Sequence, residues 1–239
     1  DSGDLKKLER FGKFRFIRPE PQAMWQPRLD AGAWVADGVF QPDKNDPKNN
    51  ESGGWNLSKN VPDCWQMQYQ KLRFLARPTP FRHLGFFPEQ AAHWNWCAEK
   101  IHKFQQRHNR RPRILNLFAY SGLASLHAAS AGAEVTHVDA SKKAIAQAFE
   151  NRDICGLEGS PIRFITDDAR GFVAREIRRQ RTYDGIIMDP PKYGRGPSGE
   201  TWRIEEGLRP LLVQAADLLS SNALFLVLTI YAIREDKTL

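Results

Sequence analysis

The sequence is poor in cysteine and has no long apolar run. Its three cysteines, Cys64, Cys97 and Cys155, are odd in number and widely spaced, with no C-x-x-C pair. This spacing argues against a disulfide framework or a structural zinc site and favours reduced thiols in the cytoplasm. The longest apolar stretch, Ala223 to Ile233, is shorter than the roughly 18 residues that span a bilayer. We interpret it as a buried strand and expect no membrane association.

Metal-ligand patterns are also missing. The six histidines show no H-E-x-x-H spacing, and Asp43 to Gly54 (DKNDPKNNESGG) lacks the acidic order of a calcium loop. No metal is implied, and this polar segment is predicted to be a solvated hairpin loop or a disordered excursion. No signal segment opens the chain, which begins at Asp1 without methionine, as a trimmed version of a longer protein would.

Length and charge set the broad class. With 239 residues, 41% hydrophobic and 26% charged, the chain can bury a core as a catalytic domain with an appendage. The net charge of +7 and the pI of about 9.4 favour an anionic partner, for which nucleic acid is the obvious candidate.

The hydrophobic pattern changes along the chain. Residues 1–80 contain short runs with period-2 apolar spacing, such as Phe14 with Phe16, and predict a β-rich subdomain of antiparallel strands. Residues 81–112 are expected to link it to the rest, with a helix over Pro88 to His108. In residues 113–239 strands and helices alternate, which predicts an α/β fold with a mostly parallel sheet and helices on both faces.

Two predicted strands end in polar residues. Ile114 to Gly122 (ILNLFAYSG) is an apolar run that breaks into small residues before a helix, and Ile186 to Tyr193 (IIMDPPKY) ends in a carboxylate and two prolines. Ligands of parallel sheets bind at the carboxyl ends of the strands. The first loop has one glycine, Gly122, where a dinucleotide fingerprint has three, so binding of a pyrophosphate is disfavoured.

Two further strands end in acidic residues. Asp139 follows the first loop by about 20 residues, a spacing at which a carboxylate can accept hydrogen bonds from both ribose hydroxyls. Asp168, next to Asp167, ends the third strand. A single aspartate at such a place is explained by helix N-capping. Two at successive strand ends, beside the first loop, favour a cofactor.

These loops carry a family resemblance. ILNLFAYSG and IIMDPPKY together resemble the cofactor and catalytic loops of class I S-adenosylmethionine-dependent methyltransferases. DPPK followed by an aromatic residue resembles the bacterial 23S ribosomal RNA methyltransferase I/K group, as does LERFG at Leu8 to Gly12. The resemblance implies a Rossmann-like sheet that binds S-adenosyl-L-methionine and releases S-adenosyl-L-homocysteine. The family completes this sheet with a sixth and a seventh strand, which are expected in residues not present here.

The resemblance also implies a set of cofactor-binding residues. In the segment FRHLGFFPEQ, which in the relatives closes over the cofactor, a phenylalanine and an acidic residue follow a glycine. The acidic residue here is Glu where Asp is more usual, and Asp168 takes the place that hydrogen-bonds the adenine amino group. The expected cofactor-binding residues are Phe87, Glu89, Asn116, Phe118, Tyr120, Ser121, Gly122, Asp139, Ser141, Asp167 and Asp168.

The catalytic loop predicts the chemistry. Methyl transfer is an in-line displacement that needs alignment more than acid-base groups. The carboxylate of Asp189 and the carbonyls of Pro190 and Pro191 can accept hydrogen bonds from a base, on which Tyr193 can stack. Lys192, Arg195 and Arg203, near this loop, are the expected contacts to RNA.

The acceptor atom follows from an absence. Members of this group that methylate carbon 5 of cytosine use a cysteine nucleophile after the fifth strand. This chain has LTIYAI there, without cysteine, so cytosine C5 chemistry would require folding to bring Cys97 or Cys64 to the site, and nitrogen methylation is favoured. We expect a methyltransferase acting on a base in RNA, above all ribosomal RNA. The alternatives are methylation of a small molecule or protein, and a non-catalytic RNA-binding relative.

Overall fold

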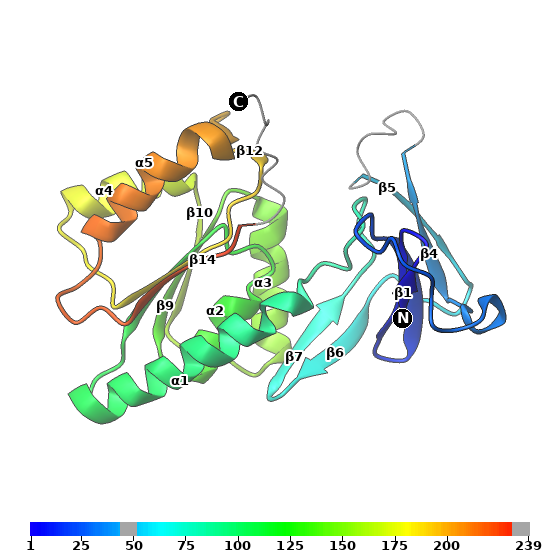
Figure 1. Cartoon of the computed structure of the whole chain (residues 1–239). Helices are drawn as coiled ribbons and strands as arrows, with labels where there is room; N and C mark the ends of the chain where they lie inside the picture. Colours follow the sequence, from blue (N-terminus) through cyan, green and yellow to red (C-terminus); the bar gives the residue numbers. More distant parts are fainter. Residues whose placement is uncertain (44–51, 231–239) are drawn as a thin grey trace. The chain divides into compact units, whose positions relative to one another are not determined.

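The computed structural model describes residues 1–43 and 52–230. Its contacts divide the chain into two compact units, Asp1–Phe87 and Pro88–Leu239 (Figure 1). Most of the polar segment predicted as a hairpin loop, residues 44–51, lies outside the described residues, as does the end of the apolar stretch beyond Ile230. Within the described ranges, no helix is long and apolar enough to cross a bilayer.

The first unit is built from strands, as predicted. A five-stranded sheet has the order β1-β2-β3-β4-β5, with β1 Ser2–Gly3, β2 Lys6–Phe11, β3 Phe14–Pro19, β4 Gly38–Pro42 and β5 Gly53–Leu57. A separate hairpin pairs β6 Trp65–Tyr69 with β7 Leu72–Ala76, and a short 3-10 helix, η1, spans Ala31–Ala33. All pairs are antiparallel except β3 with β4, which run parallel.

The core of this unit explains its tryptophans. Phe16, fully buried on β3, stacks on the Trp65 ring with centroids 5.5 Å apart and meets the edge of Trp55 at the same centroid distance. Alternate residues of β3 are buried, as expected for a strand with one covered face. Trp65 is therefore part of the core and Trp55, which is half-buried, packs at its border, whereas Trp25 is 56% exposed.

The second unit contains a parallel sheet of order β10-β9-β8-β11-β14. Its strands are β8 Arg113–Leu117, β9 Glu134–Asp139, β10 Ile162–Thr166, β11 Gly185–Met188 and β14 Phe225–Leu228. The helices are η2 Pro88–Gln90, α1 Ala91–His108, α2 Leu123–Ser130, α3 Lys142–Ile154, α4 Ala169–Arg178 and α5 Ile204–Asp217. The predicted Rossmann-like fold is confirmed. A hairpin of β12 Tyr193–Arg195 and β13 Thr201–Arg203, which was not predicted from the sequence, follows β11.

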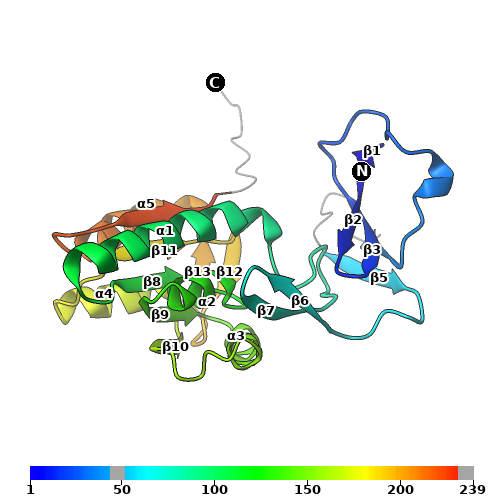
Figure 2. The ribbon, with the colours of Figure 1, turned by 90° about the horizontal axis from the view of Figure 1, so that it is seen from below.

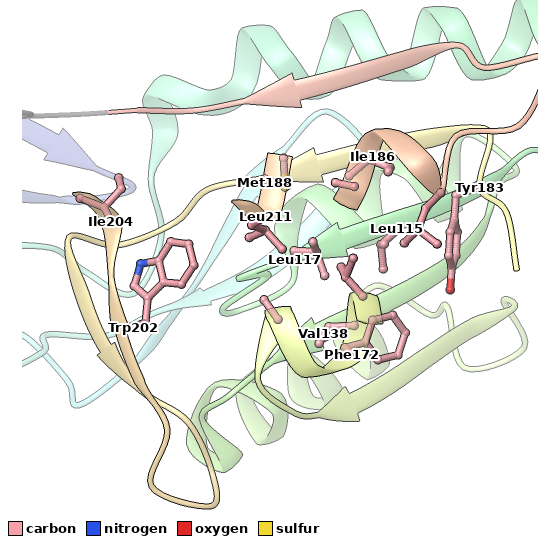
Figure 3. Close-up of a cluster of buried hydrophobic side chains, with 14 residues drawn as sticks. Leu115, Leu117, Val138, Phe172, Tyr183, Ile186, Met188, Trp202, Ile204 and Leu211 are labelled. Atoms are coloured by element: carbon pink, nitrogen blue, oxygen red, sulfur yellow. The ribbon is translucent and has the colours of Figure 1, made fainter. Parts of the chain in front are cut away.

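Helices cover both faces of the parallel sheet (Figure 2). On one face, Ile114, Val135 and Ile187 pack with residues of α1 and α2. On the other face, Leu117 and Met188 pack with residues of α4 and α5 in a cluster that has Trp202 and Ile204 at one end and Tyr183 at the other (Figure 3). Strands covered on both faces read as continuous apolar runs, which is why they were visible in the sequence.

A buried carboxylate joins the amino ends of the strands. Asp184, fully buried before β11, accepts hydrogen bonds from Arg110 Nη1 at 2.7 Å and Nη2 at 2.9 Å, from the Arg113 backbone N–H at 2.8 Å and from Ser220 Oγ at 2.8 Å. Burial raises the pKa of Asp184, but these hydrogen bonds outweigh it and bring the pKa to about 2. The segments that lead into β8, β11 and β14 are thereby fixed to one another.

Candidate cofactor and catalytic site

The loops after β8 and β9 are joined by the carboxylate of Asp139. Its Oδ2 accepts a hydrogen bond from the Tyr120 N–H at 2.8 Å, and its Oδ1 accepts one from the Ser141 N–H at 2.8 Å. Helix α3 is capped by Ser141, whose Oγ accepts from the Ala144 N–H, so capping does not explain Asp139. Burial raises the pKa of Asp139, while both backbone hydrogen bonds lower it, and the net shift is upward. A carboxylate has about four acceptor positions, so this one can also take two ribose hydroxyls.

The backbone of the first loop is held in an unusual conformation. Phe118, Tyr120 and Gly122 have φ angles of +56°, +47° and +88°. Left-handed residues other than glycine cost of order 1–3 kcal/mol each and gather at functional sites. At Gly122 an added Cβ would lie 2.9 Å from the Cβ of Ala148 on α3. This glycine is therefore required by its φ angle and by the close approach of α3.

Asn116 supports the loop from behind. Its side chain is 2% exposed, and its Nδ2 donates to Ser125 Oγ at 2.9 Å. The same hydroxyl lies 3.0 Å from Nδ1 of His137, whose pKa burial lowers to about 3. The three side chains form a buried polar group beneath α2. Asn116 therefore connects the end of β8 to α2, on the two sides of the loop of residues 118–122.

Two other predicted loop residues also pack inward. Ser121 is 3% exposed, and its carbonyl accepts a hydrogen bond from Asn151 Nδ2 at 2.9 Å. Phe118 is partly buried, with its ring centroid 4.8 Å from that of Trp202. Half-buried Tyr120 contributes its backbone to Asp139. The loop therefore offers a cofactor mainly its backbone and the carboxylate that it surrounds.

Asp167 and Asp168 both have partners on α4. Oδ1 of Asp168, which is 8% exposed, accepts from the Gly171 N–H at 2.9 Å and caps the helix. Asp167 forms an ion pair with Arg175, and its N–H donates to the Asp139 carbonyl at 3.0 Å. The cap uses one oxygen of Asp168, so capping and a hydrogen bond from an adenine amino group are compatible.

Asp189 lies at the end of β11 with its two oxygens in different surroundings. Oδ2 accepts a hydrogen bond from Gln90 Nε2 at 2.5 Å. Oδ1 is buried and has no hydrogen-bond partner within the described part of the chain. Burial raises the pKa of Asp189, the Gln90 hydrogen bond lowers it, Glu89 raises it and His93 lowers it, with a net upward shift. An unsatisfied buried carboxylate oxygen is costly, and a ligand with an N–H or O–H group would satisfy it.

The two prolines after Asp189 are held by a tryptophan. Trp202 Nε1 donates to the Pro191 carbonyl at 2.6 Å, and its ring, 3% exposed, also contacts Phe118 of the cofactor loop. Trp202 thus connects the catalytic and cofactor loops. It also occupies the Pro191 carbonyl, which was expected, together with that of Pro190, to accept a hydrogen bond from the substrate.

The hairpin after the catalytic loop exposes an aromatic ring between arginines. Tyr193, 50% exposed, pairs across the hairpin with Arg203, whose guanidinium carbon lies 5.8 Å from the ring centroid. Arg195 Nε donates to Tyr193 Oη at 3.2 Å, and Lys192 beside it is exposed. Side chains alternate across a strand, so Trp202 points inward while Tyr193 and both arginines share the outer face. The structure brings these predicted residues together.

The segment FRHLGFFPEQ is divided between the two units. Glu89 and Gln90 belong to η2 of the second unit. Glu89 is exposed, and its negative charge raises the pKa of Asp189. Phe87 ends the first unit, with its ring centroid 4.9 Å from that of His83. The expected contacts of Glu89 and Phe87 with a cofactor stay predictions.

The two cysteines of the second unit differ in burial, Cys97 being buried and Cys155 partly exposed. Cys97 is buried against α2 and the sheet, and burial raises the pKa of its thiol to about 12. Cys155 follows α3, at the amino edge of the sheet. In the described ranges, no group of three or more His, Cys, Asp or Glu residues gathers in an arrangement suited to a metal ion.

Sequence reasoning missed Gln90 and Trp202. Gln90 stands in the segment that had been compared with relatives, but only folding brings it to Asp189, 99 residues away. Trp202 is the central residue of TWR, in which one apolar side chain lies between two polar ones. This alternation is typical of a strand with one buried face, but three residues are too few to predict one.

Comparison with known proteins gives consistent matches. The model of a family described as conserved hypothetical protein 95 matches residues 90–224. The structure is similar to that of a SAM-dependent methyltransferase from Agrobacterium tumefaciens, with a TM-score of 0.91 and 46% identity, covering 98% of this chain and 72% of that one.

Curated relatives match a shorter region. Ribosomal RNA large subunit methyltransferase K/L of Shewanella baltica is 44% identical over 82 residues, which are 34% of this chain and 11% of that protein. The protein of the same name from Magnetococcus marinus is 32% identical over 156 residues, 64% of this chain and 20% of that one. The matched region is thus a fifth or less of the length of these relatives.

Proposed function

The chain belongs to the family described as conserved hypothetical protein 95, among the class I S-adenosylmethionine-dependent methyltransferases, and we propose that it transfers a methyl group to a base in RNA, with ribosomal RNA as the first candidate. The observation that carries the proposal is Oδ1 of Asp189, which is buried without a hydrogen-bond partner among the described residues, at the same edge of the sheet as Asp139. One carboxylate is suited to a cofactor and the other to an acceptor.

The residues at this edge fit the cofactor. When bound, S-adenosylmethionine supplies a methyl group on a cationic sulfonium. Asp139 would hold its ribose hydroxyls, Asp168 its adenine amino group, and the backbone of residues 118–122 would line it. Hydrogen bonds from the Tyr120 N–H to Asp139 and from Asn151 to the Ser121 carbonyl hold that backbone without a ligand, so little ordering is left to be done on binding.

Asp189 supports a nitrogen acceptor. An ionised carboxylate only accepts hydrogen bonds, so Oδ1 can hold an exocyclic N–H of a base and orient the nitrogen lone pair toward the methyl group. Formation of the N–C bond would be matched by breaking of the S–C bond, with S-adenosylhomocysteine as the leaving group. The acceptor nitrogen would then give up a proton, for which Asp189 Oδ1 is the acceptor that we propose. Cytosine C5 chemistry would instead need a thiolate, and the thiol of Cys97 is buried with a pKa of about 12.

Three observations support RNA as the substrate. Tyr193 is exposed beside the catalytic loop, with Arg195 and Arg203 on the same face of the hairpin. An aromatic ring can stack on an unstacked base while arginines contact phosphates. The chain carries a net charge of +7, and the curated relatives are named as ribosomal RNA methyltransferases.

The test is methyl transfer from labelled S-adenosylmethionine to total RNA from cells that lack this protein, with the product nucleoside identified by mass. We expect an N-methylated nucleoside in ribosomal RNA. Finding 5-methylcytidine would overturn the nitrogen assignment. Cofactor binding without labelled RNA would favour a small-molecule or protein substrate, and RNA binding without cofactor binding would favour a non-catalytic relative.

A further inference from the structure

Gln90 occupies the N-cap position of α1 but does not cap it. Its backbone is helical and continues η2 into α1, and its side chain makes no capping hydrogen bond within the described residues. The Gln90 side chain instead reaches the end of β11 and donates to Oδ2 of Asp189. The contact joins two elements of the second unit that are 99 residues apart in the chain.

This contact determines how Asp189 is oriented. A hydrogen bond to one oxygen of a carboxylate restricts the direction of the other, and the other oxygen here is Oδ1, which is buried without a partner in residues 1–43 and 52–230. We propose that Gln90 is a positioning residue that, through Asp189 Oδ2, aims Oδ1 at the amino group of the acceptor base. The inference rests on the proposed function and adds to it a specific requirement for a neutral donor at residue 90.

The neutrality of the donor matters for the chemistry. Lysine or arginine at this place would form an ion pair that lowers the basicity of Asp189 and would add positive charge beside a cationic cofactor. The neutral amide of Gln90 donates a hydrogen bond to Oδ2 of Asp189 and leaves the negative charge of the carboxylate in place. The other charged groups that act on Asp189 are Glu89 and His93, which have opposite effects on it.

The alternative is that Gln90 merely anchors α1 to the sheet. An anchoring contact would affect folding stability and cofactor binding, whereas a positioning contact affects kcat. Gln90→Ala removes the donor with little change to the helix. We expect kcat to fall about 5- to 150-fold, the range for leaving a buried polar group unpaired, with the Kd of S-adenosylmethionine within about twofold of wild type.

Gln90→Glu gives the sharper test because glutamate has almost the same shape as glutamine. When protonated, the introduced carboxyl group can donate to Asp189 Oδ2 as the amide does, whereas its ionised form repels Asp189. Two adjacent carboxyl groups share one proton, which is lost as the pH rises. We therefore expect the ratio of the variant's kcat to that of wild type to fall with rising pH, starting near one at the acid end.

Gln106→Glu is the matched control. It makes the same chemical change on an exposed position of the same helix, and it should leave kcat unchanged at every pH. A wild-type kcat in Gln90→Ala, or a pH-independent ratio in Gln90→Glu, would overturn the positioning role while leaving the proposed function intact. If the wild-type enzyme methylates no RNA, the proposed function is refuted. The kcat values of Gln90→Ala, Gln90→Glu and Gln106→Glu would then test the positioning role with the acceptor that the enzyme does methylate.

Discussion

Replacing Trp202 with phenylalanine should slow catalysis more than it weakens cofactor binding. The indole N–H donates to the Pro191 carbonyl at 2.6 Å. The ring contacts Phe118 and lies so close to Gly207 of α5 that a Cβ added to this glycine would be 2.6 Å from the indole. Phenylalanine keeps an aromatic ring in this space but removes the donor. The loop after β11 would then lose one of the hydrogen bonds that fix it to the hairpin and α5, while the Ile204 N–H would still donate to the Lys192 carbonyl.

The size of the effect follows from the lost hydrogen bond. Leaving this partly buried carbonyl without its donor costs on the order of 1–3 kcal/mol. If the loop must be in place only in the transition state, this cost corresponds to a decrease of about 5- to 150-fold in kcat. If the loop is also fixed in the free protein, the free energy of unfolding falls by the same order.

The assay compares kcat, the Kd of S-adenosylmethionine and urea unfolding for Trp202→Phe and Trp96→Phe. Trp96 lies on α1 and is 44% exposed, so the same substitution there should change none of the three by more than about 0.5 kcal/mol. A Trp202→Phe variant with wild-type kcat and an unchanged unfolding midpoint would show that the indole does not hold the catalytic loop.

Three further predictions concern other parts of the second unit. Asp189→Ala should abolish methyl transfer and leave the calorimetric Kd of S-adenosylmethionine nearly unchanged; a large loss of cofactor binding would show that its role is misassigned. Asp184 has a pKa of about 2 against an ordinary value of 3.8, so its ionised form should contribute about 2 kcal/mol of stability above pH 4. This contribution should be lost as the pH falls toward 2, and acid unfolding of Asp184→Asn should lack this component. Arg195→Ala with Arg203→Ala should weaken RNA binding at low salt and reduce the salt-dependence slope by about 2; an unchanged slope would remove the hairpin from the interface.

Much of the fold was predictable because its elements are locally encoded. The predicted alternation of strands and helices is found in the second unit, where for example α3 spans Lys142–Ile154 and β11 spans Gly185–Met188. Strand β11 is buried throughout, and α3 begins at a serine that caps it. The β12–β13 hairpin was not predicted because its strands are short and contain a single buried side chain, Trp202. The hairpin is stabilised by packing of Trp202 against α5 and against Phe118, which are not its neighbours in sequence.

The site was predictable at the level of loops and less so at the level of atoms. Parallel strands bring their carboxyl ends to one edge, which is why Asp139 and Asp189 could be expected to face the same site. The inward placement of Asn116 depends on the polar group that it forms with Ser125 and His137. The partner of Asp189 depends on where α1 begins in space, and no local pattern around Gln90 carries that information.

The strand order also determines when the site is completed. Strand β11 lies beside β8, although β9 and β10 come between them in the chain. Asp139 and the loop around it come from strands that pair with near neighbours in sequence, whereas Asp189 arrives only when β11 inserts against β8. Pairing between distant segments has a larger loop-closure entropy cost and tends to form later. During translation, the part of the site that would hold the cofactor is therefore synthesised before the part that carries Asp189. The complete site forms only when β11 pairs with β8, a pairing of distant segments that we expect to form late in folding.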